Sequence, residues 1–290
     1  MSELVLQALF SGVLVGSVYA LVALGLALAF GAMRIINLAH GELVLLAAYM
    51  AYLVESRTGL DPYFAIPLAL AVVMATSWVL FQLVDRIRDH RELNSLILTF
   101  AVGIILTNAI LLIFTSDLRT TNSPVLQDAV SFGNLFAMRG EIIAFALSLT
   151  LMGVLWWWLK ASWYGRAVRA VSSNRNAAML MGVNPARIET VSFLVAGALA
   201  AFAGVCLYTM SVIQPPLGHA LTVKAFIITV LAGVGSIPGV FLGAVLLGVT
   251  EALTVTFASS ALQELAGMVL FLLVLFLLPS GLFGARARRG

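Results

Sequence analysis

The chain has 290 residues, of which 62% are hydrophobic and 10% are charged. Soluble domains carry about 25% charged residues, so this composition excludes a soluble globular protein and indicates a polytopic membrane protein. The formal net charge of +3 says little by itself, because the placement of Lys and Arg along a membrane chain matters more than their sum. We therefore expect a single transmembrane domain over residues 1–290, without an attached soluble catalytic domain.

Apolar runs follow one another along the chain. A spanning helix needs about 20 mainly apolar residues, and five runs meet this length: 63–84, 94–114, 140–160, 190–212 and 261–279. The first run, 5–30, is also long enough. Because no basic segment and no cleavage site precede it, we interpret it as a retained helix and not as a signal peptide. Cys206 is the only cysteine, which excludes an internal disulfide and predicts a packing role.

Two regions interrupt this pattern. The run 42–55 covers only about 21 Å as a helix, too little to cross alone, and the run 225–253 is broken by "AGVGSIPGVFLG". The predicted backbone breaks are Gly31, Gly41, Gly233, Gly235, Pro238 and Gly239. Paired interruptions in the two halves of a membrane protein indicate a substrate pathway. We predict an all-α bundle of about seven to nine transmembrane segments with two interrupted or re-entrant regions, for which an inverted repeat is one interpretation.

Basic residues indicate how the chain is oriented. They gather in three clusters, Arg86, Arg88 and Arg91; Lys160, Arg166, Arg169, Arg175 and Arg187; and Arg286, Arg288 and Arg289. The remaining loops hold only Arg57, Arg119, Arg139 and Lys224, with Arg34 undecided. Because cytoplasmic loops are enriched in Lys and Arg, the three clusters are predicted to be cytoplasmic. This places the N-terminus outside and the C-terminus in the cytoplasm, and it makes 225–253 enter from outside and return.

The loop 160–190 is basic, contains no spanning run and is longer than a connection between two helices needs. Within it, "RNAAMLMGVN" (175–184) can form a short helix that ends at Gly182 and the Asn184-Pro185 turn. Its small residues suit insertion into a groove of another protein, whereas a helix lying on the anionic inner leaflet is the alternative. The predicted contact residues are Asn176, Ala177, Ala178, Met181 and Gly182.

This motif resembles the coupling loop of ABC importer permeases, in which Glu-Ala-Ala is followed by three residues and Gly. Ala177, Ala178 and Gly182 match it, and Asn176 stands where many such permeases have Glu. Further stretches are similar, in order and spacing, to permease subunits of branched-chain amino-acid ABC importers: "ALVALGLALAFGAMRIINLAHGE" (20–42), "GRAVRAVSSNRNAAMLMGVN" (165–184), "LAGVGSIPGVFLGA" (231–244) and "LPSGLFG" (278–284). The usual ending has Arg before Pro, and Leu278 stands there.

The resemblance implies a heteromeric importer in a bacterial inner membrane. It would contain this chain, a second similar permease, two cytoplasmic ABC ATPases and an extracytoplasmic substrate-binding protein. Related permeases serve urea, short amides and other small polar molecules, so the resemblance is less specific for the substrate. Neither Lys160 nor Lys224 follows a glycine, so the chain has no P-loop. We therefore expect no enzyme activity and no cofactor on this chain, with ATP and Mg on the partner ATPases.

Several polar residues lie in or beside spanning runs: Asn37, His40, Glu42, Asn108 and Glu251, with Thr107 next to Asn108. Ionisable residues in a membrane are candidates for a translocation path. The alternative is structural, since Asn37 can satisfy the backbone of a turn and Glu42 would be favoured near a helix N-terminus. His40 has no second His spaced for a metal site, so no metal is expected.

Three other classes of protein compete with this interpretation. An ion-coupled secondary transporter would use Glu42 or Glu251 as its coupling group and explains the interruptions, but it does not explain the long basic loop. A channel would share the Gly-rich stretch but needs no second interruption. An intramembrane enzyme has no supporting motif in the sequence. On the outer side, the loop 115–139 is predicted to be either a docking surface for the binding protein or a solvated loop.

Overall fold

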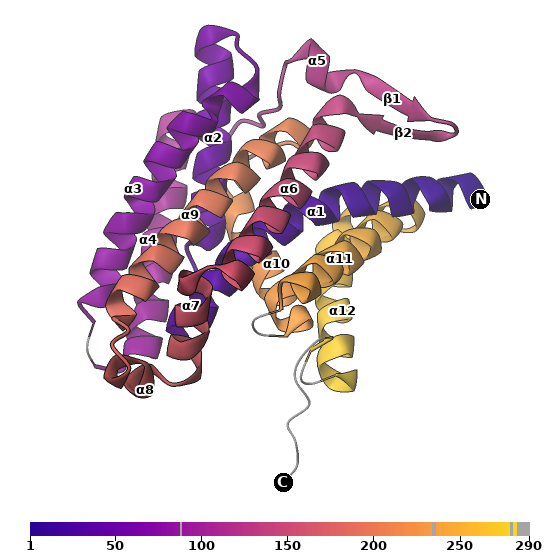
Figure 1. Cartoon of the computed structure of the whole chain (residues 1–290). Coiled ribbons are helices and arrows are strands. Elements are labelled where there is room, and N and C mark those ends of the chain that lie inside the picture. Colours follow the sequence, from indigo (N-terminus) through magenta and orange to yellow (C-terminus); the bar gives the residue numbers. More distant parts are fainter. Residues whose placement is uncertain (88, 234–235, 279–280, 283–290) are drawn as a thin grey trace.

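The structure is a computed structural model that describes residues 1–87, 89–233, 236–278 and 281–282 (Figure 1). Its α-helices are α1 (Ser2–Met33), α2 (His40–Thr58), α3 (Ile66–Asp85), α4 (Arg91–Phe114), α5 (Pro124–Gln127), α6 (Arg139–Ala161), α7 (Trp163–Ser173), α8 (Arg175–Leu180), α9 (Pro185–Met210), α10 (Leu217–Ala232), α11 (Ile237–Phe257) and α12 (Gln263–Leu277). Two 3-10 helices, η1 (Pro62–Ala65) and η2 (Ser260–Leu262), precede α3 and α12. Within the described part, seven helical segments are long and apolar enough to cross a membrane. The predicted all-α, multi-pass architecture is confirmed.

Helix α1 forms the centre of the bundle. It has 32 residues, or about 48 Å, and packs against α6, α9, α10 and α11. A helix that is apolar on every side belongs in the interior, and most residues of α1 are buried. Its contact with α11 is close, because a Cβ at Gly12 would lie 2.6 Å from the Cα of Val249. Glycine is therefore required at this crossing.

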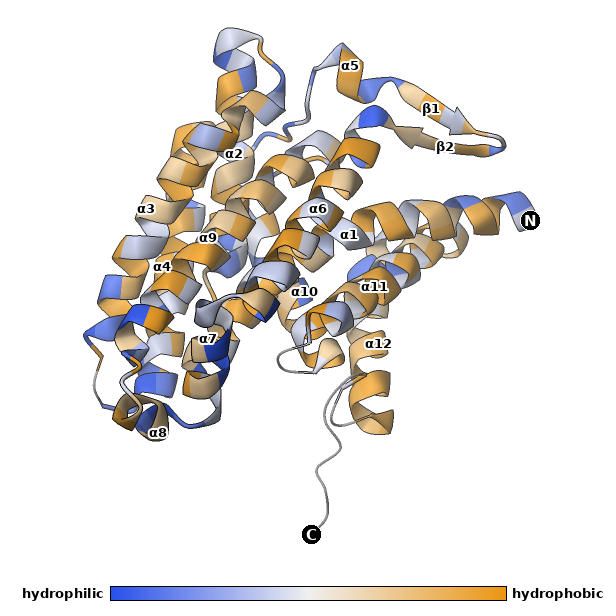
Figure 2. Ribbon diagram, in the orientation of Figure 1, coloured by the Kyte–Doolittle hydropathy of each residue, from blue (hydrophilic) through white to orange (hydrophobic). Residues whose placement is uncertain are grey.

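Helices α4 and α12 lie at the periphery. In the apolar 18-residue window of α4, only 17% of the residues are buried. In the last span, Ser260–Leu277, only 6% of the window is buried. Figure 2 shows hydrophobic residues over the outer surfaces of the long helices and hydrophilic residues around α7 and α8. An apolar periphery is what a bilayer requires of a spanning protein.

The two ends of the bundle are formed by different segments of the chain. At one end, the strands β1 (Ala129–Phe132) and β2 (Leu135–Met138) form an antiparallel hairpin beside the start of α1 (Figure 1). There the amide of Asn134 donates to Glu3 Oε1 at 2.8 Å, and that of Gln7 donates to the carbonyl of Phe136 at 2.8 Å. At the other end, Arg34 after α1 donates to the carbonyl of Ser172 in α7 at 3.0 Å. The N-terminus and the 115–139 segment therefore share one end, opposite to the 160–190 loop, while the side of the membrane that each end faces stays a prediction.

The first interrupted region consists of α1, a turn over residues 34–39, and α2. The turn runs back along α1, because His40 contacts the carbonyl of Val22, 11 residues before the end of the helix at Met33 and therefore about 16 Å from it. Helix α2 thus starts deep in the bundle. It has 19 residues and not the fourteen expected for 42–55. The prediction that Gly31 and Gly41 break the backbone is wrong, because both lie inside helices.

The second interrupted region consists of α10 and α11. The break at Gly233 is real, since α10 ends at Ala232 and Gly233 follows it with φ 78°. However, α10 begins at Leu217 and not near 225. The prediction of breaks at Pro238 and Gly239 is wrong: both lie in the first turn of α11, where Pro is favoured because its missing N–H has no helical partner. Gly235, the remaining predicted break, lies outside the described residues.

Candidate functional site

The turn before α2 is held by local polar contacts. Asn37 is 2% exposed, and its Oδ1 accepts a hydrogen bond from the backbone N–H of Ala39 at 3.0 Å. The next amide, that of Leu38, donates to Thr99 Oγ1 of α4 at 3.1 Å. Non-helical backbone at membrane depth needs such partners. Asn37 therefore fixes the non-helical turn that lets α2 begin inside the bundle.

His40 is enclosed by α1. Its ring is 1% exposed, Nε2 lies 2.9 Å from the carbonyl oxygen of Val22, and a Cβ at Gly25 would lie 2.8 Å from Cε1. The missing side chain of Gly25 makes room for the ring. Among the described residues, no group of three or more His, Cys, Asp or Glu is placed to hold a metal ion. The position of His40 is that of a satisfied packing residue.

The N-terminal ends of α2 and α10 meet inside the bundle. The backbone N–H of Gly41 donates to Thr222 Oγ1 at 2.8 Å, and a Cβ at Gly41 would lie 2.0 Å from the carbonyl oxygen of Gly218. Glu42 lies in the first turn of α2, is 4% exposed, and its Oε2 is 3.4 Å from Thr222 Oγ1. Two helix N-termini carry positive partial charge, which the carboxylate of Glu42 complements.

Glu251 belongs to a buried polar cluster that we call the Lys224 cluster, formed by Tyr19, Lys224, Glu251 and Gln263. Lys224 Nζ lies 2.7 Å from Glu251 Oε2 and 3.0 Å from the hydroxyl of Tyr19. Gln263 also donates to Glu251 Oε2, at 2.8 Å. The cluster joins α1, α10 and α11 to the start of α12. The placement of Lys224 in an outer loop is wrong, because it lies in α10 and its side chain is 14% exposed.

Asn108 does not join the other predicted residues. It lies on the peripheral helix α4, is exposed, and its amide donates to the carbonyl of Ile104 in its own helix at 2.8 Å. The structure thus brings Asn37, His40 and Glu42 together at the start of α2, places Glu251 in the Lys224 cluster, and leaves Asn108 outside.

A large hollow lies at the α7 end of the bundle. Its volume is about 1070 Å³, and it is lined by α1, α6, α7 and α11, including Gly31, Lys160, Arg169 and Pro238. Gly31 and Pro238 come from the two interrupted regions. The two regions therefore border one open space at this end, although neither residue breaks its helix.

Helix α8 carries the motif of the 160–190 loop. Asn174 caps the helix by accepting from the backbone N–H of Ala177 at 3.0 Å, and Gly182 with φ 83° ends the segment. Asn176 and Ala177 are exposed, but Ala178 is 4% exposed and packs in the core beneath α7 and α9. Ala178, which was predicted as a contact residue, is therefore buried within this chain and does not belong to its outward face. The outward tip consists of Met179, Leu180 and Met181, exposed by 49%, 89% and 85%.

Hydrogen bonds and ion pairs tie this loop to the neighbouring helices. The hydroxyl of Tyr164 in α7 donates to the carbonyl of Ile188 in α9 at 2.6 Å. Burial raises the pKa of Tyr164 to about 12, so the phenol stays protonated and remains a donor. Glu189, whose side chain is 1% exposed, accepts from Arg91 at 2.9 Å and from Arg175 at 3.0 Å. The loop is thereby tied to both α4 and α9.

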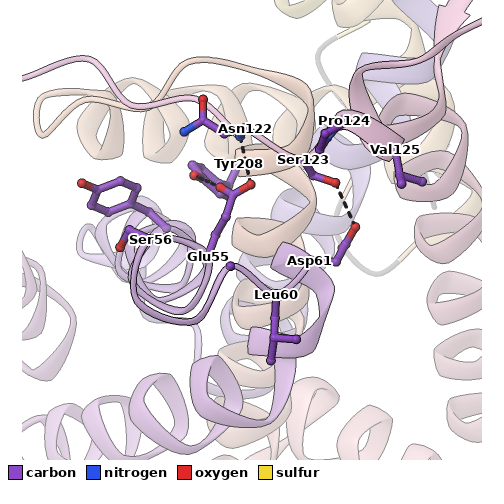
Figure 3. Close-up of a pocket in the computed structure, with 11 residues that line it drawn as sticks. Glu55, Ser56, Leu60, Asp61, Asn122, Ser123, Pro124, Val125 and Tyr208 are labelled. Carbon is purple, nitrogen blue, oxygen red and sulfur yellow. Dashed lines mark hydrogen bonds between the residues drawn. The ribbon is translucent and has the colours of Figure 1, made fainter.

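A second hollow opens at the hairpin end. It has a volume of about 510 Å³ and lies between the end of α2 and the 115–139 segment. Figure 3 shows Glu55 beside Tyr208 and Asn122, and Ser123 opposite Asp61. Glu55 accepts from the backbone N–H of Asn122 at 2.9 Å and from the hydroxyl of Tyr208. The 115–139 segment thus contains α5 and a hairpin, which the sequence analysis did not predict.

Sequence reasoning missed Lys224, Tyr19 and Glu189 as members of polar clusters. A signal for Lys224 was present, since a lone lysine in an apolar helix requires a buried carboxylate, and Glu251 lies one helix further along. Tyr19 and Glu189 carried no such signal. Their partners come from distant segments, and only the packing of the helices brings them together.

Comparison with known proteins agrees with this architecture. Residues 8–278 match the family described as branched-chain amino acid transport system / permease component. The chain is 31% identical to the high-affinity branched-chain amino acid transport system permease protein LivH of Escherichia coli, over 96% of this chain and 95% of LivH. It is also 31% identical to BraD, named as the corresponding permease of Pseudomonas aeruginosa, over the same shares.

A more distant relative is the permease protein LivM of Salmonella typhimurium, which is 27% identical over 89% of this chain and 66% of LivM. No solved structure matches the chain. The family match and the identity to LivH and BraD cover nearly the whole chain. The chain therefore belongs to the family of permease components of branched-chain amino acid transport systems.

Proposed function

We propose that this chain is a permease subunit of an ATP-driven importer that moves branched-chain amino acids into the cytoplasm across a bacterial inner membrane. The observation that carries the proposal is similarity to LivH and BraD over 96% of the chain. The whole chain acts as one domain, and the loop 160–190 is its coupling element. Affinity for the substrate resides in an external binding protein.

ATP hydrolysis belongs to two partner ATPases, with their own ATP and Mg. This chain has two lysines, and neither stands in a P-loop. Helix α8 is the segment that docks into the ATPases, and its exposed tip supplies the contact through Met179, Leu180 and Met181. The basic residues around the tip support a cytoplasmic position for this end, with the N-terminus outside and the C-terminus inside.

The extracytoplasmic partners follow from the opposite end. The binding protein docks against the hairpin and the hollow beside Glu55. Similarity to both LivH and LivM supports pairing with a second, homologous permease.

The substrate passes near the meeting point of α2 and α10, where Asn37, His40 and Glu42 lie.

The test is uptake of labelled leucine by proteoliposomes that contain this chain, the permease and ATPases encoded beside it, and the binding protein. The proposal predicts uptake that requires both ATP on the ATPase side and the binding protein. Full-rate uptake with unchanged selectivity in the absence of the binding protein would contradict the role assigned to that protein. ATP hydrolysis that the binding protein stimulates, without leucine uptake, would support the importer architecture and indicate that the substrate is urea or a short amide.

A further inference from the structure

A basic hollow lies where α1, α4, α7, α8 and α9 meet. It has a volume of about 260 Å³, and its polar lining consists of Arg34, Arg91, Ser172, Ser173, Asn174, Arg175 and Glu189. Three guanidinium groups thus face one carboxylate. Asp85, at the edge of the group, lies 3.6 Å from Arg91 and is 45% exposed. Even with Asp85 included, three guanidinium groups meet two carboxylates, so the group keeps an excess of positive charge.

Glu189 positions the guanidinium groups and leaves donors available. It engages Arg91 through Nη2 and Arg175 through Nε. The Nε atom of Arg91 is buried and has no hydrogen-bond partner among the described residues. Arg34 adopts φ 55°, unusual for a residue with a side chain, and its Nη2 bonds to the carbonyl of Ser172. Three planar donors held around one space match the requirements of a phosphate group.

An apolar groove continues from this hollow. It has a volume of about 590 Å³, shares Arg34 and Ser172 with the basic hollow, and is otherwise lined mainly by apolar side chains, namely Phe30, Ile36, Leu93 and Leu96, with Glu92 at its edge. Leu93 is 66% exposed. The groove therefore offers hydrocarbon contact beside the basic hollow, an arrangement that a soluble anion would not use.

We infer that the basic hollow and the adjoining groove form a binding site for an anionic phospholipid of the cytoplasmic leaflet. The headgroup phosphate lies between Arg34, Arg91 and Arg175, and an acyl chain lies along Leu93 and Leu96. Basic pockets between transmembrane helices on the cytoplasmic side suit such headgroups. The groove favours a lipid over a free phosphate, because it can cover an acyl chain, which a free phosphate lacks.

The site would connect the bundle to the coupling helix. Arg34 follows α1 and precedes the turn that holds Asn37, and Arg175 is the first residue of α8. A phosphate bound to both would link the start of α2 to the loop at 160–190. This consequence for coupling and the assignment to the cytoplasmic leaflet rest on the proposed function, whereas lipid binding itself does not.

The experiment measures phospholipid that stays bound to the purified full-length chain by native mass spectrometry, after extraction from vesicles of equal phosphatidylglycerol and phosphatidylcholine. We expect the wild type to retain phosphatidylglycerol preferentially. The Arg34→Gln/Arg175→Gln variant should reduce this preference roughly tenfold to thirtyfold, since each basic residue contributes about 1 kcal/mol. The matched control is Arg187→Gln, which removes an exposed arginine of the same loop that does not line the hollow.

A second pair of variants tests the groove. Leu93→Ser should weaken retention, whereas Ile97→Ser should not, because both side chains are about two-thirds exposed on α4 but only Leu93 lines the groove. Equal losses in Arg187→Gln and the double arginine variant would overturn the site in favour of general surface charge. Displacement of the lipid by inorganic phosphate, with Leu93→Ser unaffected, would overturn the lipid in favour of a soluble anion. Lipid retention is measured without transport, so these outcomes test the lipid site whether or not the chain transports leucine.

Discussion

At the residue scale, Gly31 and Gly41 are both helical, but they lie in very different surroundings. A Cβ at Gly41 would lie 2.0 Å from the carbonyl oxygen of Gly218, whereas a Cβ at Gly31 would meet nothing within 4 Å. Gly41→Ala should therefore destabilise the protein by roughly 1–3 kcal/mol through overpacking. Gly31→Ala should stabilise it by roughly 0.5–1 kcal/mol, since Ala is the better helix former.

Thermal unfolding of the two variants in detergent distinguishes these expectations. The melting temperature should fall for Gly41→Ala and rise or stay constant for Gly31→Ala. A loss of stability in both variants would show that Gly31 is needed for a backbone conformation that the structure does not contain.

The Lys224 cluster leads to a second prediction at this scale. Removing one partner of a buried ion pair leaves the other charge uncompensated, which costs roughly 3–5 kcal/mol. Lys224→Met should therefore lower the melting temperature strongly, and Lys224→Met combined with Glu251→Gln should restore much of the loss. Thermal unfolding in detergent measures the stability of both variants. Additive losses in the double variant would contradict a direct pairing of Lys224 with Glu251.

At the element scale, the α8 segment separates Ala178 from Met181, which the sequence analysis had both assigned to the contact with another protein, and exposes Leu180 instead. Leu180 is 89% exposed and Ala178 is 4% exposed. Leu180→Arg should therefore reduce co-purification of the ATPases at least tenfold, with the fold unchanged, because a charge would replace an apolar contact at the centre of the docking surface. Ala178→Arg should disturb the loop itself, because the larger side chain has no space in the core.

Co-purification together with limited proteolysis of the loop measures both effects. We expect normal protease resistance for Leu180→Arg and increased cleavage near 175–184 for Ala178→Arg. Normal recovery of the ATPases with the Leu180→Arg variant would show that α8 is not part of the docking surface.

The elements show how far the sequence alone could lead. The six long apolar runs were predicted correctly, and so was the short helix ended by Gly182, because length and Gly/Pro placement are local properties. The starts of α2 and α10 were not predicted correctly, because they depend on distant contacts. His40 takes its position from α1, and Gly218 takes its position from Glu42. The hairpin at Ala129–Met138 was missed although a local signal was present, because its two strands are joined by two residues, Gly133 and Asn134, and Gly133 has φ 65°.

At the scale of the whole molecule, the two ends should be accessible from opposite sides of the membrane. Cys206 is buried, so a Cys206→Ala background allows single cysteines to be placed elsewhere. On intact cells, an impermeant thiol reagent should label Asn134→Cys in the hairpin and should not label Leu180→Cys in α8 until the membrane is opened. The reverse pattern would contradict the proposed orientation.

The central claim is that ATP, and not an ion gradient, drives leucine across the membrane through this chain. The most direct measurement compares labelled leucine uptake in the reconstituted vesicles under two conditions: ATP without an imposed gradient, and a proton or sodium gradient without ATP. We predict uptake with ATP alone, none with a gradient alone, and loss of the ATP-driven uptake in the Leu180→Arg variant. Uptake driven by a gradient in the absence of ATP would contradict the importer and indicate an ion-coupled transporter.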